Sequence, residues 1–378
     1  MLDVEGRKIA AELREVFARG VDAPLDDATF DALARRVFAY QFERNEPYAA
    51  YCRRRGVTPE DVDHWTRIPA VPTAAFKHLT LVCGPLEEAE AVFRTSGTTL
   101  GPEQRGSHYM LDLTLYHASL VPNFAAYVLP DGAELPMLAL VPPAKQVPDS
   151  SLIHMIDVVM DRLGADGSGY FVDPAAGILE DELDRALVGF IEQGTPVCLI
   201  GTAFSFVHWL DRLRERGRRY ALPPGSRLMD TGGFKGRSRE VPAEELRAMY
   251  AEWLGIPDDH CVNEYGMTEL GSQFYDTVLR ERVKTGAAGP RHKVAPPWVR
   301  TRVVSADTLE PLPPGEVGLL CHWDLANLGS VLAVQTEDLG RETDDGGFVV
   351  LGRASGAPPR GCSIAMDLLL EAAREARP

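Results

Sequence analysis

The decisive stretch of this chain is Arg94-Thr95-Ser96-Gly97-Thr98-Thr99-Leu100-Gly101, which directly follows the β-rich run Ala91–Phe93. Glycines let a backbone approach a phosphate group closely, and loop amides with Ser and Thr hydroxyls supply hydrogen-bond donors. The stretch has no Gly-Lys-Ser/Thr ending, so it does not indicate a Walker-type NTPase. A phosphate-binding loop and an ordinary Ser/Thr-rich turn between a strand and a helix are both compatible with it.

Short β-rich runs and helical patterns alternate after this loop. The β-rich runs lie at Pro136–Val141, Pro196–Ile200 and Arg227–Met229. The helical patterns that separate them lie at Asp112–Tyr127, Ser151–Leu163, Glu180–Glu192, Phe204–Arg216 and Glu244–Leu254. Alternation of this kind predicts an α/β fold with a largely parallel sheet.

The whole chain divides into four expected segments. They are a helical N-terminal region (1–85), an α/β core (86–285), a small β subdomain (286–351), and a hinge with a C-terminal tail (352–378). The first segment shows a long helical pattern over Asp26–Arg54 and a short one near Asp61–Trp65. Gly- and Pro-bounded strands replace helices after about Gly286, and a last helix is expected over about Ile364–Arg374.

Composition and charge exclude several classes of protein. The 378 residues include 39 Lys and Arg against 55 Asp and Glu, a formal net charge of −16, which disfavours nucleic acid and anionic membrane surfaces as partners. No apolar run approaches the roughly 20 residues that span a bilayer. The first residues show no signal-peptide pattern, so we expect a cytoplasmic protein. Six cysteines without a CxxC pair argue against a zinc site and a disulfide framework.

Three further motifs offer nucleotide-binding chemistry. Asn263–Glu269 (Asn-Glu-Tyr-Gly-Met-Thr-Glu) supplies a ring for a nucleobase, a hydroxyl for a phosphate and a carboxylate for Mg²⁺; a helix capped by Thr268 is the alternative. Asp230–Gly236 (Asp-Thr-Gly-Gly-Phe-Lys-Gly) has two glycines onto which a planar ring can pack, and a tight turn is the alternative. Asp338 and Arg353, in two strand patterns, can hold a ribose or can belong to an ordinary hairpin.

In this order, the Ser-Gly-Thr-Thr loop, the Tyr-Gly-Met-Thr-Glu segment, Asp338 and Gly352-Arg353 resemble the adenylate-forming superfamily, which converts carboxylic acids to acyl-AMP. Within it, the chain is similar to the LuxE-type acyl-protein synthetases. The family-like stretches are Ile68–Lys77 (Ile-Pro-Ala-Val-Pro-Thr-Ala-Ala-Phe-Lys), Tyr265–Tyr275, and Arg360-Gly361-Cys362-Ser363 just after the hinge. The resemblance implies the large α/β domain of that superfamily, with a small β subdomain and a short, truncated C-terminal tail.

The resemblance also implies an enzyme that uses ATP and Mg²⁺ and gives individual residues their roles. The nucleotide-binding residues would be Thr95, Ser96, Thr98 and Thr99 at the β- and γ-phosphates, with Gly97 in the same loop, Gly232, Gly233 and Tyr265 at adenine, with Gly266 and Met267 in the segment of Tyr265, and Asp338 with Arg353 at the ribose. The catalytic residues would be Thr268 at the α-phosphate, Glu269 at Mg²⁺ and Cys362 as the acyl acceptor.

Cys362 is the expected acceptor because an acyl-AMP must meet a thiolate, either from CoA or from the protein. Arg360 precedes it by two residues and Ser363 is expected to cap the last helix, so a cation and a helix N-terminus both lower the thiol pKa. A surface cysteine in a frayed tail is the alternative. Cys52, next to three arginines at a helix end, is a weaker candidate for a reactive thiol. The acyl group is expected to pass on to an acyl-reductase partner.

The chain departs from full-length acyl-CoA ligases at two places. Residues 354–378, 25 in all, follow Arg353 and include no lysine, so the mobile lid and its adenylating lysine are expected to be absent. Leu100 stands where glycine commonly follows the second Thr, and Arg105 is the nearest cation. A CoA ligase of the phenylacetate-CoA ligase type and a non-catalytic nucleotide-binding subunit remain the alternatives. A fatty acid is the expected substrate, with Gly201–Phe206 in the pocket wall, and its chain length stays open.

Overall fold

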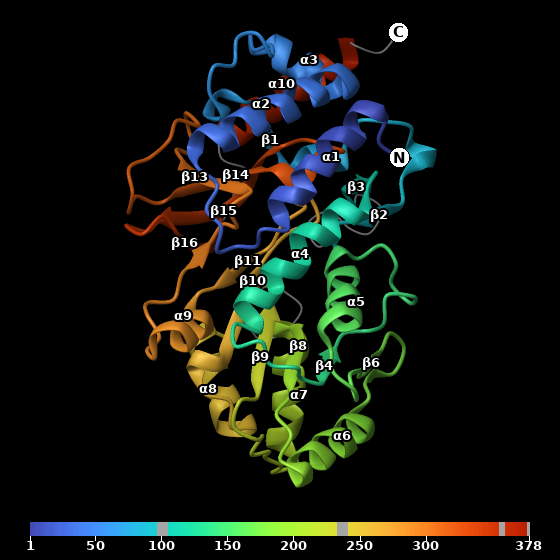
Figure 1. Ribbon diagram of the computed structural model, residues 1–378, viewed down its shortest axis with the longest axis vertical. Helices are drawn as coiled ribbons and strands as arrows, with labels where there is room; N and C mark the ends of the chain where they lie inside the picture. The colour runs from blue at the N-terminus through green and yellow to red at the C-terminus, as the bar shows by residue number, and fades with distance from the viewer. Residues whose placement is uncertain (97–104, 233–240, 355–359, 376–378) are drawn as a thin grey trace. The chain divides into compact units, whose positions relative to one another are not determined.

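The computed structural model describes residues 1–96, 105–232, 241–354 and 360–375, with the side chains of 365–372 in the last range (Figure 1). The chain forms two compact units. Unit 1 comprises Met1–Asn123, Met267–Gln273 and His292–Pro378, and unit 2 comprises Phe124–Gly266 and Phe274–Arg291. The chain therefore passes from unit 2 to unit 1 between Gly266 and Met267. The four-segment division expected from the sequence stays a prediction.

Unit 2 is built on a sheet that is parallel except at one edge. Its strand order is β11 (Phe274–Asp276), β10 (Cys261–Tyr265), β9 (Arg227–Thr231), β8 (Cys198–Thr202), β4 (Met137–Leu140) and β5 (Gly169–Tyr170). All pairs from β10 to β5 are parallel, and β11 runs antiparallel to β10. Every residue of β4 is buried, as expected for an apolar strand covered on both faces. The predicted α/β fold with a largely parallel sheet is confirmed.

The helices of unit 2 lie close to their predicted positions, except α9, which was not predicted. They are α5 (Ser151–Leu163), α6 (Glu180–Gln193), α7 (Ala203–Glu215), α8 (Ala243–Leu254) and α9 (Val278–Thr285); α4 (Leu113–Val128) precedes them, and β6 (Val172–Asp173), β7 (Gly177–Ile178) and η4 (Asp258–His260) are short. Gly194 and Gly255, both at positive φ, end α6 and α8 in the left-handed conformation that favours glycine. Thr202 ends β8 and caps α7, because its Oγ1 accepts a hydrogen bond from Ser205 N (3.0 Å).

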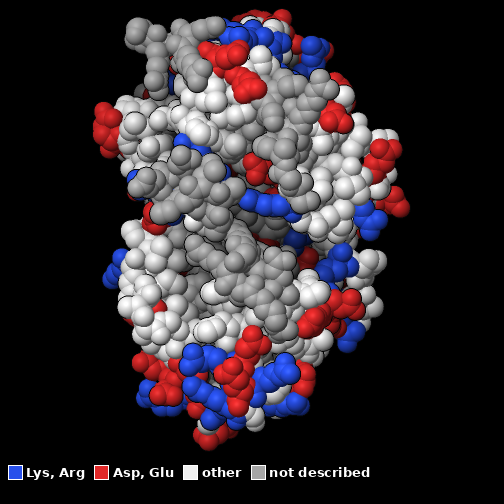
Figure 2. Space-filling model, turned by 180° about the vertical axis from the view of Figure 1, so that it is seen from behind, with Lys and Arg blue, Asp and Glu red and all other residues white. Residues whose placement is uncertain are grey.

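Acidic and basic side chains lie next to one another over the end of unit 2 that α6 and α7 form, at the bottom of Figure 2. Arg212 and Arg216 both pair with Glu180 at the start of α6. Arg218 pairs with Asp184 of the same helix. These pairs join the two helices at their exposed surface, where each contributes at most about 1 kcal/mol. The three arginines at the end of α7 and just after it, Arg212, Arg216 and Arg218, are thus paired with carboxylates of α6.

Unit 1 begins with three helices, α1 (Val4–Phe17), α2 (Asp27–Arg44) and α3 (Glu46–Arg54). The single helix predicted over Asp26–Arg54 is wrong, because the backbone leaves helical geometry at Asn45 (φ −114°, ψ 84°). The Asn45 side chain then caps α3, and Pro47 occupies the first turn, where a missing N–H costs nothing. The helix predicted near Asp61–Trp65 is also wrong, since a short 3-10 turn, η1 (Trp65–Arg67), is found there.

A mainly antiparallel sheet in unit 1 confirms the strands predicted after Gly286. Its order is β13 (Val299–Val304), β14 (Gly318–Asp324), β15 (Ala333–Glu342), β16 (Phe348–Arg353) and β12 (Lys293–Val294), with β1 (Val71–Pro72) parallel to β15. A separate hairpin consists of β2 (Ala91–Arg94) and β3 (Ser107–Met110). The short helical turns are η2 (Thr73–Lys77), η3 (Leu86–Glu88) and η5 (Leu325–Asn327).

The last helix, α10 (Arg360–Glu375), packs against α3, β1 and η2, so elements from both ends of the sequence lie side by side in unit 1 (Figure 1). Ala365, Leu369 and Ala372 form its buried face. Because α10 begins four residues earlier than predicted, Ser363 lies inside it, and the prediction that Ser363 caps the helix is wrong. Among the residues that the structure describes, no helix has the length and apolar character needed to cross a bilayer.

Candidate functional site

The predicted phosphate loop connects β2 with β3, and hydrogen bonds between its two ends close its base. Thr95 N donates to Gly106 O (2.9 Å), and Gly106 N donates to Thr95 Oγ1 (2.8 Å). Arg105 adds hydrogen bonds to the carbonyl oxygens of Arg94 and Thr95. A Cβ at position 106 would lie 3.2 Å from Thr95 Cγ2 and 3.3 Å from Phe76, so only glycine fits there without a shift of its neighbours.

Two of the four predicted phosphate contacts, Thr95 and Ser96, lie in the described part of the loop. The Thr95 hydroxyl oxygen accepts a hydrogen bond within the hairpin, and Ser96 is exposed. The loop connects two antiparallel strands, so the alternative of a turn between a strand and a helix is wrong. Outside the described residues lie Gly97, Thr98 and Thr99, and also the predicted adenine contact Gly233.

Thr268 and Glu269 lie in the segment 267–273 of unit 1. Thr268 O accepts a hydrogen bond from His108 Nδ1 (2.7 Å) on β3, and Glu269 O accepts one from Asn327 Nδ2 (2.8 Å). Because a carbonyl oxygen only accepts, the His108 ring carries a proton on Nδ1. Burial lowers the pKa of His108 to about 4, so the ring is neutral near pH 7. One side chain therefore connects the phosphate-loop hairpin with the segment that carries Thr268.

A turn follows the Tyr-Gly motif, and it is closed by a hydrogen bond from Leu270 N to Met267 O (3.2 Å). No helix begins at Thr268 in this described segment, so the alternative in which Thr268 caps a helix is wrong. The Glu269 side chain is buried, with 6% of its surface exposed.

The predicted ribose pair is brought together on neighbouring strands of unit 1. Asp338 on β15 and Arg353 on β16 are register partners, and Arg353 Nε lies 3.6 Å from Asp338 Oδ1. The Asp338 side chain is half-buried and that of Arg353 is exposed. A carboxylate and a guanidinium thus lie side by side, which is the acceptor and donor set that two hydroxyl groups require.

In unit 2, β9 and β10 end side by side at residues predicted to contact adenine. Thr231 and Glu264 are register partners, and Thr231 Oγ1 donates a hydrogen bond to Glu264 Oε2. Gly232 follows with φ +73°, in the left-handed region that favours glycine. The Tyr265 ring packs against Phe274 of β11 with centroids 5.7 Å apart. These are the carboxyl ends of parallel strands, where open α/β sheets bind their ligands.

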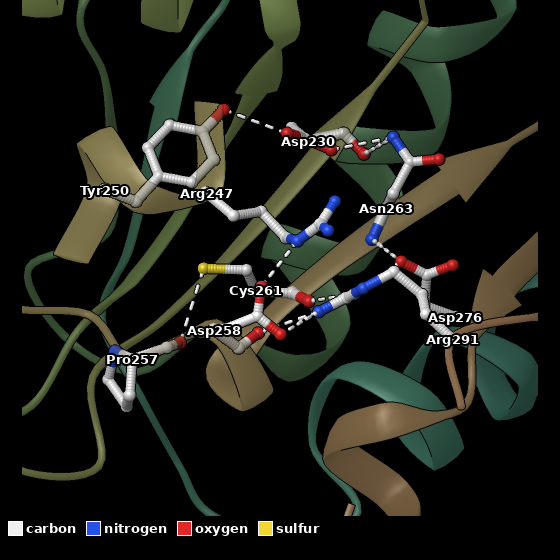
Figure 3. Close-up of polar contacts among 9 residues, drawn as sticks. All are labelled: Asp230, Arg247, Tyr250, Pro257, Asp258, Cys261, Asn263, Asp276 and Arg291. Carbon is white, nitrogen blue, oxygen red and sulfur yellow. Dashed lines mark hydrogen bonds and ion pairs between the residues drawn. The ribbon is translucent and has the colours of Figure 1, made fainter. Parts of the chain in front are cut away.

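A network of polar side chains connects β9, β10 and β11 just before these strand ends (Figure 3). Tyr250 Oη donates to Asp230 Oδ2 (2.9 Å), and Asn263 Nδ2 donates to Asp230 Oδ1 (2.7 Å), which joins α8, β9 and β10. Asn263 N donates to Asp276 Oδ2 (3.1 Å) of β11, and Arg291 donates to the same oxygen (2.6 Å). The three strands are therefore fixed to one another just before the predicted adenine contacts.

Comparison with known families agrees with this arrangement. The model of the family described as acyl-protein synthetase, LuxE, matches residues 26–370. The chain belongs to this family. The long-chain-fatty-acid–luciferin-component ligase of Vibrio harveyi is 24% identical over 357 residues, which cover 89% of this chain and 86% of that protein. The protein of the same name from Aliivibrio fischeri is 23% identical over 366 residues, with 90% and 88% covered. At the level of the family, the predicted LuxE-type ligase is confirmed.

Solved structures show that the chain has the fold of adenylate-forming ligases, as predicted. A 2-hydroxyisobutyryl-CoA ligase in the postadenylation state matches with a TM-score of 0.62 at 15% identity, covering 86% of this chain and 67% of that one. The same ligase in the thioesterification state matches with a TM-score of 0.63 at 17% identity, covering 86% and 68%. At these identities the likeness concerns the fold alone.

Four residues of the candidate site were not predicted from the sequence: His108, Asn327, Thr231 and Glu264. Thr231 and Glu264 stand inside two of the quoted motifs, and their place at strand ends is the signal that could have identified them. His108 and Asn327 contact Thr268 and Glu269 over separations of 160 and 58 residues. No local pattern indicates contacts of that range.

The donor set of the candidate site fits a magnesium ion that binds together with a nucleotide. The described side chains include no group of three or more His, Cys, Asp or Glu residues that could hold a metal ion. Mg²⁺ in nucleotide-dependent enzymes is usually held by one or two carboxylates together with phosphate oxygens and water. Glu269, a single carboxylate next to Thr268, matches this pattern.

Cys362 lies in the first turn of α10, and its side chain is outside the described part of the structure. The cysteines with described side chains, at positions 52, 83, 198, 261 and 321, are all buried. Burial raises the pKa of the Cys52 thiol to about 12 and outweighs the opposite effect of Arg55 and Arg53, so the prediction of a reactive thiol at Cys52 is wrong. Cys52 is therefore a structural cysteine, and Cys362 stays the candidate acceptor.

Proposed function

We propose that this chain activates a long-chain fatty acid with ATP and carries the acyl group as a thioester on Cys362. In the first step a carboxylate oxygen attacks the α-phosphorus of ATP, the bond to pyrophosphate breaks, and acyl-AMP forms. In the second step the Cys362 thiolate attacks the acyl carbon and AMP leaves. The thioester then passes to a cysteine of an acyl-reductase partner by thiol exchange, which regenerates the Cys362 thiol.

The hydrogen bond from His108 to Thr268 is the observation that carries the first step. It joins the hairpin of the phosphate loop to the segment of the predicted α-phosphate contact within one unit of the fold. In-line transfer at phosphorus needs positioned donors and charge neutralisation more than covalent chemistry by the protein. Two phosphate-contacting motifs that are held together in this way meet that need.

Each predicted contact keeps its role in this proposal. Thr95, Ser96, Thr98 and Thr99 donate to the β- and γ-phosphates, Thr268 donates to the α-phosphate, Gly232, Gly233 and Tyr265 pack on adenine, and Asp338 with Arg353 binds the ribose hydroxyls. Glu269 holds Mg²⁺, which supplies charge neutralisation at the phosphates when it is bound. Asp338 accepts from the ribose hydroxyls while Arg353 neutralises the carboxylate.

The names of the two relatives favour a fatty acid as the substrate, because both are called long-chain-fatty-acid ligases. Gly201, in the proposed pocket wall, has Leu140 Cβ 3.0 Å and Phe206 Cε2 3.2 Å from the place of a Cβ. Glycine thus lets β8 approach Phe206 closely at the end of a parallel strand. We expect the acyl chain to lie along this wall.

ATP–pyrophosphate exchange across saturated fatty acids of increasing length tests the first step. We expect exchange that depends on both Mg²⁺ and the fatty acid. Glu269→Gln should raise the Mg²⁺ concentration needed for half-maximal exchange while it leaves the melting temperature nearly unchanged. If none of the acids in the panel supports pyrophosphate exchange, the proposed enzymatic function is rejected. The alternative of a non-catalytic nucleotide-binding subunit then takes its place.

The CoA ligase alternative predicts a different product from the same reaction. With CoA present, a CoA ligase releases acyl-CoA and leaves its own cysteines unlabelled. The proposed enzyme instead labels Cys362, and the label is removed by hydroxylamine as expected for a thioester. Separating acyl-AMP, acyl-CoA and protein-bound acyl after one incubation distinguishes the two functions.

A further inference from the structure

Asp324, the last residue of β14, is a buried carboxylate that contacts the segment carrying Thr268 and Glu269. None of its surface is exposed. Its Oδ2 accepts a hydrogen bond from Gly271 N (3.0 Å), and its Oδ1 accepts one from Ser272 Oγ (2.8 Å). Oδ1 also accepts from Ala326 N (2.9 Å), which caps η5. One carboxylate therefore fixes the end of β14 and two consecutive residues after the Thr-Glu turn.

The hydroxyl of Ser272 extends this contact into a directed hydrogen-bond chain. Because an ionised carboxylate only accepts, the Ser272 hydroxyl donates to Asp324. Ser272 Oγ then accepts from Ser119 Oγ (2.9 Å) and from Trp298 Nε1 (3.2 Å), and Trp298 Nε1 also lies 2.9 Å from Ser119 Oγ. These three residues are fully buried. Asp324 thus sets the direction of the hydrogen bonds that the Ser272 and Ser119 hydroxyls donate.

The backbone around Gly271 leaves no room for the segment to move toward η5. A Cβ at position 271 would lie 2.9 Å from Ala326 Cβ and 3.0 Å from the Ala326 carbonyl carbon and oxygen. Asn327, the next residue, donates to Glu269 O. The segment 267–273 therefore packs against Ala326 of η5, and it is hydrogen-bonded at Glu269 to Asn327 of η5 and at Gly271 to Asp324, the cap of η5.

We propose that Asp324 is a positioning residue for nucleotide activation, which holds the turn 267–270 so that Thr268 and Glu269 meet the phosphates and Mg²⁺. This inference rests on the roles given to Thr268 and Glu269 in the proposed function. Burial raises the pKa of Asp324 to about 6, so the fold retains a carboxylate where an apolar residue would be buried at lower cost. A carboxylate is what two adjacent donors, one of them a backbone N–H, require.

Asp324→Asn is the direct test, because it keeps the size of the side chain but replaces one acceptor oxygen by a donor. Hydrogen exchange of the segment 267–273 and exchange kinetics with Mg·ATP and a fatty acid are measured on the full chain. We expect faster amide exchange in this segment and a kcat lower by between about 10- and 100-fold, as for a small misplacement of reacting groups. KM for the fatty acid should change less than about twofold.

Two further variants separate positioning from folding. Ser272→Ala removes one hydrogen bond to Asp324 and keeps those from Gly271 N and Ala326 N, so it should show the same changes to a smaller extent, even if the Asp324→Asn chain does not fold. Thr301→Val removes the hydrogen bond between Thr301 Oγ1 and His322 Nδ1 (2.9 Å), which joins β13 to β14 and involves neither Asp324 nor the segment 267–273. It should lower the melting temperature without changing exchange in 267–273 or kcat.

The inference is overturned if Asp324→Asn and Ser272→Ala leave either the segment's amide exchange or kcat at the value of the unmodified chain. It is also overturned if the loss of kcat in Asp324→Asn is matched by Thr301→Val. Failure of the proposed function looks different: the unmodified chain itself then shows no pyrophosphate exchange, or Glu269→Gln leaves the Mg²⁺ dependence unchanged. The hydrogen-exchange measurement needs no turnover and decides in every case whether Asp324 holds the segment.

Discussion

Replacing His108 by asparagine tests how the phosphate-loop hairpin is joined to Thr268. Asparagine Nδ2 can take nearly the place of His108 Nδ1, so the variant keeps a donor for Thr268 O and loses the ionisable ring. In the folded chain, burial lowers the pKa of His108 from 6.5 to about 4. The unfolded chain therefore binds this proton more readily, and the fold loses stability as the pH falls below about 6.5.

The size of this loss follows from the two pKa values. Proton linkage gives about 1.4 kcal/mol at pH 5.5 and about 2.5 kcal/mol at pH 4.5, relative to pH 7.5. The His108→Asn variant has no titrating ring at this position, so its free energy of unfolding does not decrease in this way as the pH falls. At pH 7.5 it should be less stable than the unmodified chain by roughly 1–3 kcal/mol, since the smaller side chain leaves space beside Phe76. The free energies of unfolding of the two proteins should therefore converge as the pH falls.

Urea unfolding at pH 7.5, 6.5, 5.5 and 4.5 measures the convergence. Phe76→Leu is the matched control, because Phe76 packs edge-on against His108 (centroids 5.6 Å apart, 73°) and does not titrate. Its free energy of unfolding should stay below that of the unmodified chain by a constant amount at every pH. A difference between His108→Asn and the unmodified chain that is the same at pH 7.5 and 4.5 would refute the buried, neutral His108.

Three other substitutions have outcomes that the contacts determine. Asp131→Asn breaks the two-point ion pair with buried Arg227 (2.8 and 2.9 Å) and should cost roughly 1–2 kcal/mol at pH 7 in urea unfolding, allowing for the solvent exposure of Asp131. This cost should vanish as the pH falls from about 4 toward 2, since Arg227 lowers the pKa of Asp131 to about 2. Gly271→Ala should lower the free energy of unfolding by about 1–3 kcal/mol through its clash with Ala326, and pyrophosphate exchange should fall with it. Leu369→Ala should loosen α10, with a packing loss of about 2–5 kcal/mol, so proteolysis of the C-terminal helix quickens while pyrophosphate exchange is kept.

The helices and strands that local causes specify could be predicted closely from the sequence. The bounds predicted for α5 agree with the structure, because an apolar face and the Ser150 cap are both local features. The break at Asn45 was missed, although Asn45 followed by Pro47 is a local start signal for a helix. The contact that holds the break, from Asn45 Nδ2 to Ser330 O (3.1 Å), spans 285 residues and has no trace in a local pattern.

In the candidate site, too, the parts with a local sequence signal could be predicted and the parts that depend on distant contacts could not. The motifs at 94–101, 230–236 and 263–269 could be located because glycines, hydroxyls and carboxylates cluster after strand patterns. The side chains that hold these motifs, such as His108 and Asp324, come from distant strands and turns. From sequence alone, a histidine or aspartate in a strand pattern is assigned to the core. Its contact with a motif is known only once the structure shows which distant residue it is hydrogen-bonded to.

The mass of the tryptic peptide Gly361–Arg374 tests the proposed function most directly, because Cys362 is its single cysteine. The unmodified chain is incubated with Mg·ATP, a long-chain fatty acid and CoA, and then digested. We predict that the peptide gains the mass of the fatty acid less one water, that hydroxylamine removes this mass, and that Cys362→Ser abolishes it while pyrophosphate exchange continues. An unlabelled peptide in a reaction that accumulates acyl-CoA would contradict the proposal and identify a CoA ligase.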